Sequence, residues 1–373
     1  MIGWAGSQLR PNMSAPSQHV RFCASRDGTR IAFATSGSGP PLVRAAHWLS
    51  HLDHEPRCPL WGPWIKLLAR RHTLIRYDGR GCGLSDRDPA DFSLDRCVED
   101  LEAVVDSCKL SRFVLFGATI GGMTALTYAA RHPERVSHLV IIGSLAVGRM
   151  KRDPPALIEE TALELKAIEL GWGNDNPAFR QFFTSMFIPD STPEQARSLN
   201  ELIRIASTPQ SAIRRLQPFH YVDLREAAAQ VRCPTLVFHA RHDARIPFEQ
   251  GRALATLIPG ARFVALDSRN HWVVETEPAW PQFIAEIDGF LPGVPDAPAK
   301  AGVLNALTPR ELQVLELLAA GLDNGTIGRR LGISTKTVRN RVSVIFDKLG
   351  VNSRPLAIVL ARDAGFGRKP SCE

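Results

Sequence analysis

The 373-residue sequence contains no apolar run that approaches the roughly 18 residues of a membrane-spanning helix. Its first stretch, MIGWAGSQLRPNMSAPSQ, holds one arginine and no apolar segment, which argues against a secretory signal peptide. None of the seven cysteines forms a Cys-x-x-Cys pair and their number is odd, so neither a disulfide framework nor a zinc site is expected. These absences favour free thiols in a reducing cytoplasm and no membrane partner.

Internal repeats and long low-complexity segments are also missing. Hydrophobic residues make up 44% of the chain and charged residues 22%, which is typical of a globular protein of two or three domains. The charge is unevenly distributed. Residues 301–373 hold eleven Lys and Arg against six Asp and Glu, so this last fifth carries +5 of the net charge of +7. Such an asymmetry points to a nucleic-acid-binding domain at the C-terminus.

A proline- and glycine-rich stretch, LPGVPDAPAKAG, interrupts the periodic pattern after residue 290 and predicts an interdomain linker. We therefore expect a flexible leader over residues 1–18 and a first domain over residues 19–291. The linker follows at residues 292–303 and a second, smaller domain at residues 304–368.

Short buried strands alternate with amphipathic helices in the first domain. The strands are expected at residues 30–35, 41–46, 72–77, 112–116, 138–143, 235–239 and 262–266, and the helices at residues 61–70, 94–108, 122–131, 248–258 and 279–290. This alternation predicts an α/β fold with a doubly wound, mostly parallel sheet. Between about residues 148 and 230 the pattern is helical only. We interpret that segment as a lid over the carboxyl edge of the sheet, where such folds bind ligands.

The stretch FGATIGG, residues 116–122, lies between a strand-like run and a helix-like run. Four further motifs follow the same order as in one known family: RYDGRGCGLSD (76–86), AARHPERVSHLVIIGS (129–144), PTLVFHARHDARIP (234–247) and LDSRNHW (266–272). Together the five resemble the α/β-hydrolase fold over residues 20–291. In that family a nucleophile, an acid and a histidine follow in chain order. The resemblance implies these positions at Thr119, Asp243 and His271.

Thr119 departs from the serine that this family usually has at the turn. The turn holds its residue at positive φ, which is costly for a β-branched side chain, and the extra methyl group hinders rotation of the hydroxyl toward the histidine. Known threonine nucleophiles lie at a chain terminus and use their own amine as base. We therefore expect a poor nucleophile or an inherited turn residue, and assign no catalytic residue. The ligand-binding residues expected are Trp48, Thr119, Ile120, Asp243 and His271, with Ile120 and Trp48 near the family's oxyanion donors.

Two other groups of residues were weighed as sites. HWLSHLDHEP, residues 47–56, holds three histidines, but its spacing matches no metal-ligand pattern, so a long polar loop is the better interpretation. The tryptophans could line a pocket or belong to the core, and for any one of them the core is favoured: Trp48, Trp61, Trp64, Trp172 and Trp272. We expect no metal and no cofactor.

The C-terminal segment carries a clear series of helix signals. Thr308-Pro-Arg-Glu311 is a capping box with proline at the first helical position. A short helix is expected over residues 324–331, and Gly332-Ile-Ser334 forms a turn into the next helix. In that helix the apolar residues recur at spacings of four, three and four, which predicts a buried stripe: Val338, Val342, Ile345 and Leu349.

The other face of this helix is polar and cationic. On charge alone it could be an ordinary solvated face, but LTPRE, STKTVRNRV and FDKLGVNSRPLA together resemble the LuxR-type four-helix DNA-binding domain. The resemblance implies a recognition helix in the major groove and a last helix, residues 353–364, that pairs in a dimer. Gly325, Gly328 and Arg341 depart from the family pattern. The DNA-binding residues expected are Thr335, Lys336, Thr337, Arg339, Asn340, Arg341, Ser343 and Lys348.

The two resemblances together predict a ligand-responsive transcriptional regulator that binds double-stranded DNA as a homodimer, with RNA polymerase as a candidate partner. Its ligand is expected to be small and hydrophobic, held in a degenerate hydrolase pocket. One alternative is an active esterase that uses Thr119, His271 and Asp243. Another is cofactor-free oxygenation or carbon–carbon chemistry on the Asp243–His271 pair.

Overall fold

The structure, a computed structural model, describes residues 18–152, 154–174, 176–291 and 307–349, and residues 354, 357, 358, 361, 366 and 367. The chain divides into two compact units, Met1–Pro292 and Gly293–Glu373. Each unit has its own cluster of buried hydrophobic side chains, so each is described by itself. The predicted leader lies almost wholly outside the described residues, and the predicted linker does so entirely.

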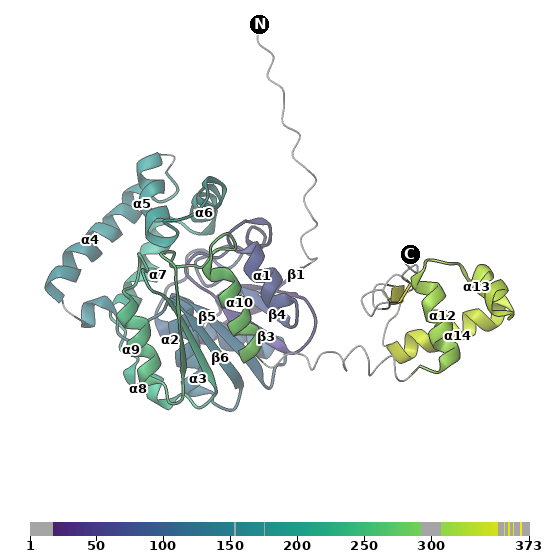
Figure 1. Cartoon of the computed structure of the whole chain (residues 1–373). Helices are drawn as coiled ribbons and strands as arrows, with labels where there is room; N and C mark the ends of the chain where they lie inside the picture. Colours follow the sequence, from purple (N-terminus) through teal and green to yellow (C-terminus); the bar gives the residue numbers. More distant parts are fainter. Residues whose placement is uncertain are drawn as a thin grey trace, which may run out of the picture. The chain divides into compact units, whose positions relative to one another are not determined.

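The first unit is built on one sheet (Figure 1), with strand order β1-β2-β4-β3-β5-β6-β7-β8. The strands are β1 (His19–Ala24), β2 (Arg30–Ser36), β3 (Pro41–Ala45), β4 (Thr73–Tyr77), β5 (Phe113–Ala118), β6 (Val136–Ile142), β7 (Thr235–Ala240) and β8 (Arg262–Leu266). β2 pairs antiparallel with β1 and with β4, and all the other pairs are parallel. The predicted α/β fold with a mostly parallel sheet is confirmed.

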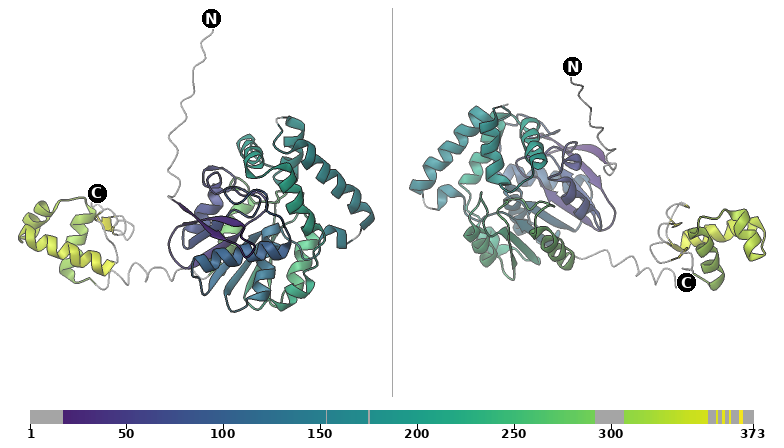
Figure 2. Two further views of the ribbon diagram at one scale, coloured as in Figure 1. Left: turned by 180° about the vertical axis from the view of Figure 1, so that it is seen from behind. Right: turned by 45° about the horizontal axis from the view of Figure 1, so that its top comes forward.

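Helices cover both faces of this sheet (Figures 1 and 2). They are α1 (Gly62–Ala69), α2 (Leu94–Ser107), α3 (Ile120–Arg131), α8 (Arg225–Gln230), α9 (Phe248–Leu257) and α10 (Ala279–Phe290). α3 packs against both α2 and α8, and α8 packs against α9. α1 and α10 meet through the rings of Trp64 and Phe283, whose centroids lie 4.7 Å apart. The sheet is thus a layer buried between helices, and this packing holds in place the loops that follow its strands.

The chain between β6 and β7 is helical and forms a group at one end of the sheet in every view (Figures 1 and 2). Before α8 it contains η2 (Arg149–Lys151), α4 (Pro154–Gly171), α5 (Pro177–Phe187), α6 (Pro193–Ala206) and α7 (Pro209–His220). Thr192 and Thr208 cap α6 and α7, each followed by proline at the first helical position. Such a cap contributes about 1 kcal/mol, which explains why both helices begin where the sequence repeats Thr-Pro.

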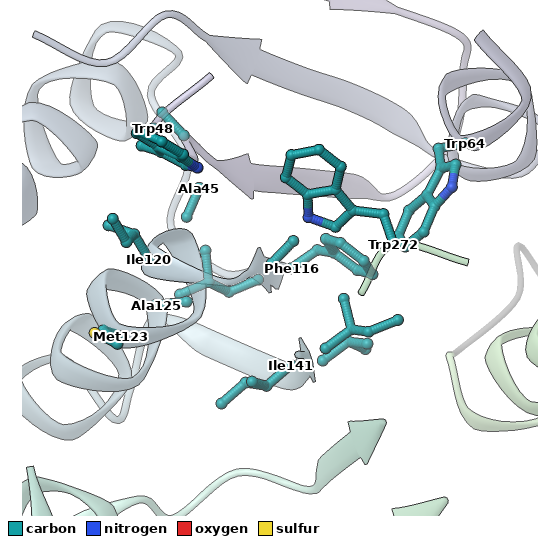
Figure 3. Close-up of a cluster of buried hydrophobic side chains, with 14 of the residues drawn as sticks. Ala45, Trp48, Trp64, Phe116, Ile120, Met123, Ala125, Ile141 and Trp272 are labelled. Atoms are coloured by element: carbon teal, nitrogen blue, oxygen red, sulfur yellow. The ribbon is translucent and has the colours of Figure 1, made fainter. Parts of the chain in front are cut away.

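The tryptophans of the first unit lie mostly in its core. Trp64 and Trp272 pack together with Phe116 beside the sheet, whereas Trp48 lies apart from them near Ile120 of α3 (Figure 3). The indole N–H of Trp64 donates to the carbonyl of Val273 at 2.8 Å, so this buried polar atom is satisfied. Of the described helices, none is long and apolar enough to cross a membrane.

The second unit contains α12 (Pro309–Ala319), α13 (Asn324–Leu331) and α14 (Thr335–Leu349). The predicted capping box is present: Thr308 Oγ1 accepts from the amide of Glu311, and Glu311 Oε2 accepts from the amide of Thr308. Gly332 ends α13 at φ 64°, a left-handed conformation that glycine adopts without strain. The fourth predicted helix, residues 353–364, lies mostly outside the described residues.

Candidate functional site

The turn between β5 and α3 places Thr119 at the end of a central strand. Thr119 has φ 53° and ψ −120°, as the elbow frame predicted, and such a conformation costs about 1–3 kcal/mol for a residue with a side chain. Two glycines make the turn possible. A Cβ at Gly117 would lie 2.5 Å from the carbonyl oxygen of Gly121, and one at Gly121 would lie 2.8 Å from that of Ala45.

Hydrogen bonds hold the backbone of Thr119 in this conformation. Its amide donates to the carbonyl of Ile142 at 3.0 Å, and the hydroxyl of Ser144 donates to its carbonyl at 2.8 Å. Its own hydroxyl is different: Thr119 Oγ1 is buried and has no hydrogen-bond partner within the described part of the chain. A buried hydroxyl without a partner costs about 1–3 kcal/mol, and such groups are found where a ligand or water is to bind.

Asp243 and His271 form a hydrogen-bonded pair, as the sequence predicts. His271 Nδ1 lies 2.8 Å from Asp243 Oδ2, and Asp243 Oδ1 accepts from the amides of Arg245 (2.7 Å) and Ile246 (3.0 Å). Burial raises the pKa of Asp243, but His271, His239 and the amide of Ile246 together outweigh it and the pKa lies below the usual value. A carboxylate accepts and does not donate, so Nδ1 carries the proton and Nε2 is free to act as an acceptor.

Four of the five predicted ligand residues line one cavity: Trp48, Thr119, Ile120 and His271. Asp243 lies behind His271 and is fully buried. Nevertheless, Thr119 Oγ1 and His271 Nε2 do not form a hydrogen bond with each other or with any described residue. The site therefore unites the expected residues but lacks the link that would make His271 the base for Thr119.

The cavity is small and is bordered in part by α3, α5 and α7. Its volume is about 60 Å³, well below the roughly 300–1,000 Å³ of sites for drug-sized ligands. The apolar part of its lining comes from the sheet edge, α3 and the helical segment. These residues are Trp48, Ile120, Met123, Leu145, Phe187, Leu216, Phe219 and Ile246. Figure 3 shows Trp48 facing Ile120, with Met123 one turn further along α3.

The remaining lining residues were not predicted from the sequence. Arg149, Arg152, Arg245 and His220 also border the cavity. A usable signal was present, because RMKR, residues 149–152, begins seven positions after the last residue of β6, and ligands bind at that edge of such sheets. Arg245 is separated from Arg149 by almost a hundred residues, so only the fold brings the two together.

The histidine-rich loop after β3 has a structural role. Glu55 is fully buried and pairs with Arg76 at 2.8 Å and with Arg44 at a shorter distance. These two guanidinium groups lie on β3 and β4, so the expected polar loop instead closes over a buried ion cluster. Among the described residues there is no group of three or more His, Cys, Asp or Glu side chains placed to hold a metal ion.

In the second unit, α14 separates its faces as predicted. Val338, Ile345 and Leu349 are buried together with Val342. Most of the predicted DNA-binding residues are exposed: Thr335, Lys336, Arg339, Asn340 and Ser343. Thr337 and Arg341 are half-buried, and the hydroxyl of Thr337 bonds with that of Ser334, the cap of α14 (2.8 Å).

Lys348 points elsewhere. Its ammonium group lies 2.8 Å from Glu311 Oε2, so it joins the end of α14 to the start of α12. The hydrogen bonds from Lys348 and from the Thr308 amide lower the pKa of Glu311 to about 2. The structure also explains why position 328 is glycine, which the sequence analysis had noted only as a departure from the family pattern. A Cβ there would lie 2.7 Å from the carbonyl oxygen of Ile333, in the turn before α14.

Comparisons with known proteins agree with both units. Residues 54–278, more than half of the chain, match the alpha/beta hydrolase fold family. Residues 305–361 match the luxR family of bacterial regulatory proteins. The match over residues 305–361 includes all of α12, α13 and α14.

Several similar proteins carry the names of hydrolases. The chain is 29% identical over 246 residues to a pimeloyl acyl-carrier-protein methyl ester esterase of Nitrosomonas europaea, covering 65% of this chain and 92% of that protein. It is 28% identical over 274 residues to a 2-hydroxymuconate semialdehyde hydrolase of Pseudomonas sp. This match covers 66% of this chain and 85% of that protein. The crystal structure of an enol-lactonase from Burkholderia xenovorans has the same fold, with a TM-score of 0.59, 22% identity and 72% and 99% coverage.

The elbow, the Asp243–His271 pair and the sheet order thus agree with the family match over the first unit. The chain belongs to the alpha/beta hydrolase fold family, and it carries a C-terminal helix-turn-helix domain of the luxR family of bacterial regulatory proteins.

Proposed function

We propose that the protein is a transcriptional regulator that binds promoter DNA as a dimer and responds to a small molecule held in the hydrolase-fold unit. The observation that carries this proposal is α14 itself. Its apolar side packs in the core of the second unit, while Lys336, Arg339 and Asn340 are exposed. Arg and Asn side chains can bond to base edges, and cations bind phosphates. A helix with this arrangement in a luxR-family domain is suited to the major groove.

The pocket is proposed to bind its ligand without consuming it. Thr119 Oγ1 has no hydrogen bond to His271, and Thr119 is a β-branched residue held at φ 53°. A sensor benefits from a ligand that persists, because occupancy then reports concentration. Ligand binding shifts DNA affinity only when it favours one of two arrangements of the chain. We place that change in the pairing of two chains, through residues 353–364, with RNA polymerase as a further partner at the promoter.

Selection of DNA sites tests the proposal directly. The full chain is incubated with a library of random duplexes, bound duplexes are sequenced, and the enriched sequence is measured by gel shift at several salt concentrations. We expect an inverted repeat and an affinity that falls steeply with salt, because phosphate contacts release counterions. The absence of any sequence bound more tightly than random duplex, with and without candidate ligands, would refute a regulator that recognises promoters.

An active hydrolase is the second candidate, favoured by the intact hydrogen bond between Asp243 and His271 and by the hydrolase names of similar proteins. It predicts turnover of simple esters by the wild-type chain that is lost in His271→Ala. Activity that survives in His271→Ala would exclude this candidate, because the histidine is its general base.

A further inference from the structure

The cavity beside Thr119 has an excess of positive charge for its size. Three guanidinium groups border it, from Arg149, Arg152 and Arg245. Glu164 of α4, which is nearly buried, pairs with Arg149 (3.2 Å) and with Arg245 through both of its oxygens. The carboxylate of Glu164 is therefore shared by two of the three guanidinium groups, and the third has no carboxylate beside it among the described residues.

Arg152 is this third cation. With the described residues it forms no ion pair, and its buried Nε donates no hydrogen bond to any of them. Burial lowers the pKa of Arg152, and the charge of Arg149 lowers it further. Both effects mean that the protonated form is held at a cost in free energy, which a bound anion would recover.

Other carboxylates nearby do not remove the excess. Asp243 already accepts hydrogen bonds from His271 and from two backbone amides. Glu160, on the outer side of α4, is exposed and raises the pKa of Arg149 only from a distance. Three guanidinium groups thus face two buried carboxylates, Glu164 and Asp243, both of which already have partners.

Uncharged polar atoms in the cavity also lack partners. Thr119 Oγ1, His271 Nε2 and His220 Nε2 are buried without a hydrogen bond to a described residue. Ile120 is the first residue of α3, so its amide has no partner within the helix, and the helix dipole favours negative charge there. The rest of the lining is apolar, with Leu145, Leu216 and Phe219 among it.

We propose that the ligand of the hydrolase-fold unit is a small apolar carboxylic acid, bound as its anion, with the carboxylate held by Arg152 and the apolar body against the side chains of the cavity. Arg149 supplies further donors, since a guanidinium group binds a carboxylate through two parallel hydrogen bonds. This inference rests on the proposed function, because it names the chemical class of the molecule that the regulator senses. It narrows the expectation from the sequence, which was a hydrophobic ligand without a stated charge.

The test compares acids with neutral molecules of the same shape. Acetate, propanoate and butanoate, which suit a cavity of this size, are titrated into the full chain by calorimetry, beside acetamide, propanamide and butanamide. We expect at least one acid to bind about tenfold or more tightly than its amide, the ratio that a charge-assisted hydrogen bond supplies. Inorganic phosphate, which has charge but no apolar body, is expected to bind more weakly than that acid.

Two neighbouring substitutions make a matched pair. Arg152→Gln should remove the preference for the acid, whereas Lys151→Gln removes the same charge from an exposed side chain that does not line the cavity and should retain it. If Arg152→Gln fails to fold, the comparison of acid with amide on the wild-type chain still decides. The inference is overturned if no acid binds more tightly than its amide, including the case in which neither binds. Equal preference in both variants, or phosphate bound more tightly than every acid, also overturns it.

Failure of this inference differs from failure of the proposed function. If the chain binds an acid through Arg152 but recognises no DNA sequence, the anion site is supported and the proposed regulatory function is refuted. A chain whose DNA binding responds to an uncharged molecule, and not to any acid, would remain a regulator with a different ligand class.

Discussion

At the residue scale, Thr119 is the residue on which our proposal for the first unit depends. Its positive φ is imposed by the turn between Gly117 and Gly121, where neither glycine has room for a side chain. A β-branched residue is strained in this position, and its hydroxyl has no partner. The turn is therefore preserved at a cost in stability, while the atom that would attack a substrate is not engaged by His271.

Thr119→Ser should restore part of a hydrolase. Serine keeps the hydroxyl and loses the methyl group, so its oxygen can rotate toward His271 Nε2. General-base assistance is worth about 10²–10⁴-fold in rate, and we expect kcat/KM for p-nitrophenyl butyrate to rise about a hundredfold over wild type, at the low end of that range. The double variant Thr119→Ser/His271→Ala is the control and should return to the wild-type rate. A single variant no more active than wild type would show that the methyl group is not what prevents turnover.

His220 gives a prediction about pH. Burial, with the charges of Arg149 and Arg245, lowers its pKa to about 4, against the opposite effect of Glu164. Because the folded pKa is below the unfolded value of about 6.5, the unfolded chain takes up the proton first as the pH falls. The stabilisation is therefore complete above about pH 6.5 and is lost as the pH falls toward 4, by up to about 3 kcal/mol.

Urea unfolding of the full chain followed by tryptophan fluorescence measures this loss, because all seven tryptophans precede residue 292. His220→Gln should reduce the fall in the free energy of unfolding between pH 7 and 5. Part of the fall should remain, since burial also lowers the pKa of His47 to about 4. An identical pH dependence in wild type and His220→Gln would contradict the assignment.

At the element scale, α14 is expected to divide its residues between DNA and the domain core. Arg339 is exposed, whereas Lys348 is joined to Glu311 across the unit. Arg339→Ala should weaken binding to the selected duplex by about tenfold, corresponding to about 1–3 kcal/mol for a lost base contact, without changing thermal stability. Lys348→Ala should lower the melting temperature of the second unit and change DNA affinity less. Calorimetry and gel shift measure the two effects, and a reversed pattern would place Lys348 on the DNA instead.

The elements that could be predicted are those with local signals. Thr308-Pro309 located the start of α12, because the cap and the proline act within one turn. The same Thr-Pro signal begins α6 and α7, which the sequence analysis predicted only as part of a helical segment. The sequence analysis did not predict β1. Most of its side chains are exposed, and it lies at the edge of the sheet, where β2 is its one neighbouring strand in the described part of the chain. For the same reason, only those site residues that lie in sequence motifs could be predicted. Thr119 and His271 lie in motifs, whereas Arg149, Arg152 and Arg245 form a group only through the fold.

At the scale of the whole molecule, we propose that a ligand bound in the first unit changes DNA binding by the second. The two units have separate cores, so communication requires that the ligand favour one arrangement of the chain or of a dimer. A coupling free energy of about 1–3 kcal/mol would change DNA affinity about 5- to 150-fold. Destruction of the ligand during this process would turn the sensor into an enzyme with a transient response.

One measurement tests this claim most directly. Fluorescence anisotropy of the selected duplex is recorded with the wild-type chain, with and without the acid that binds most tightly, and the acid is quantified by chromatography before and after. Our account predicts a change in DNA affinity of at least about fivefold and full recovery of the acid. A DNA affinity that the bound acid leaves unchanged, or an acid that is consumed during the titration, would contradict it.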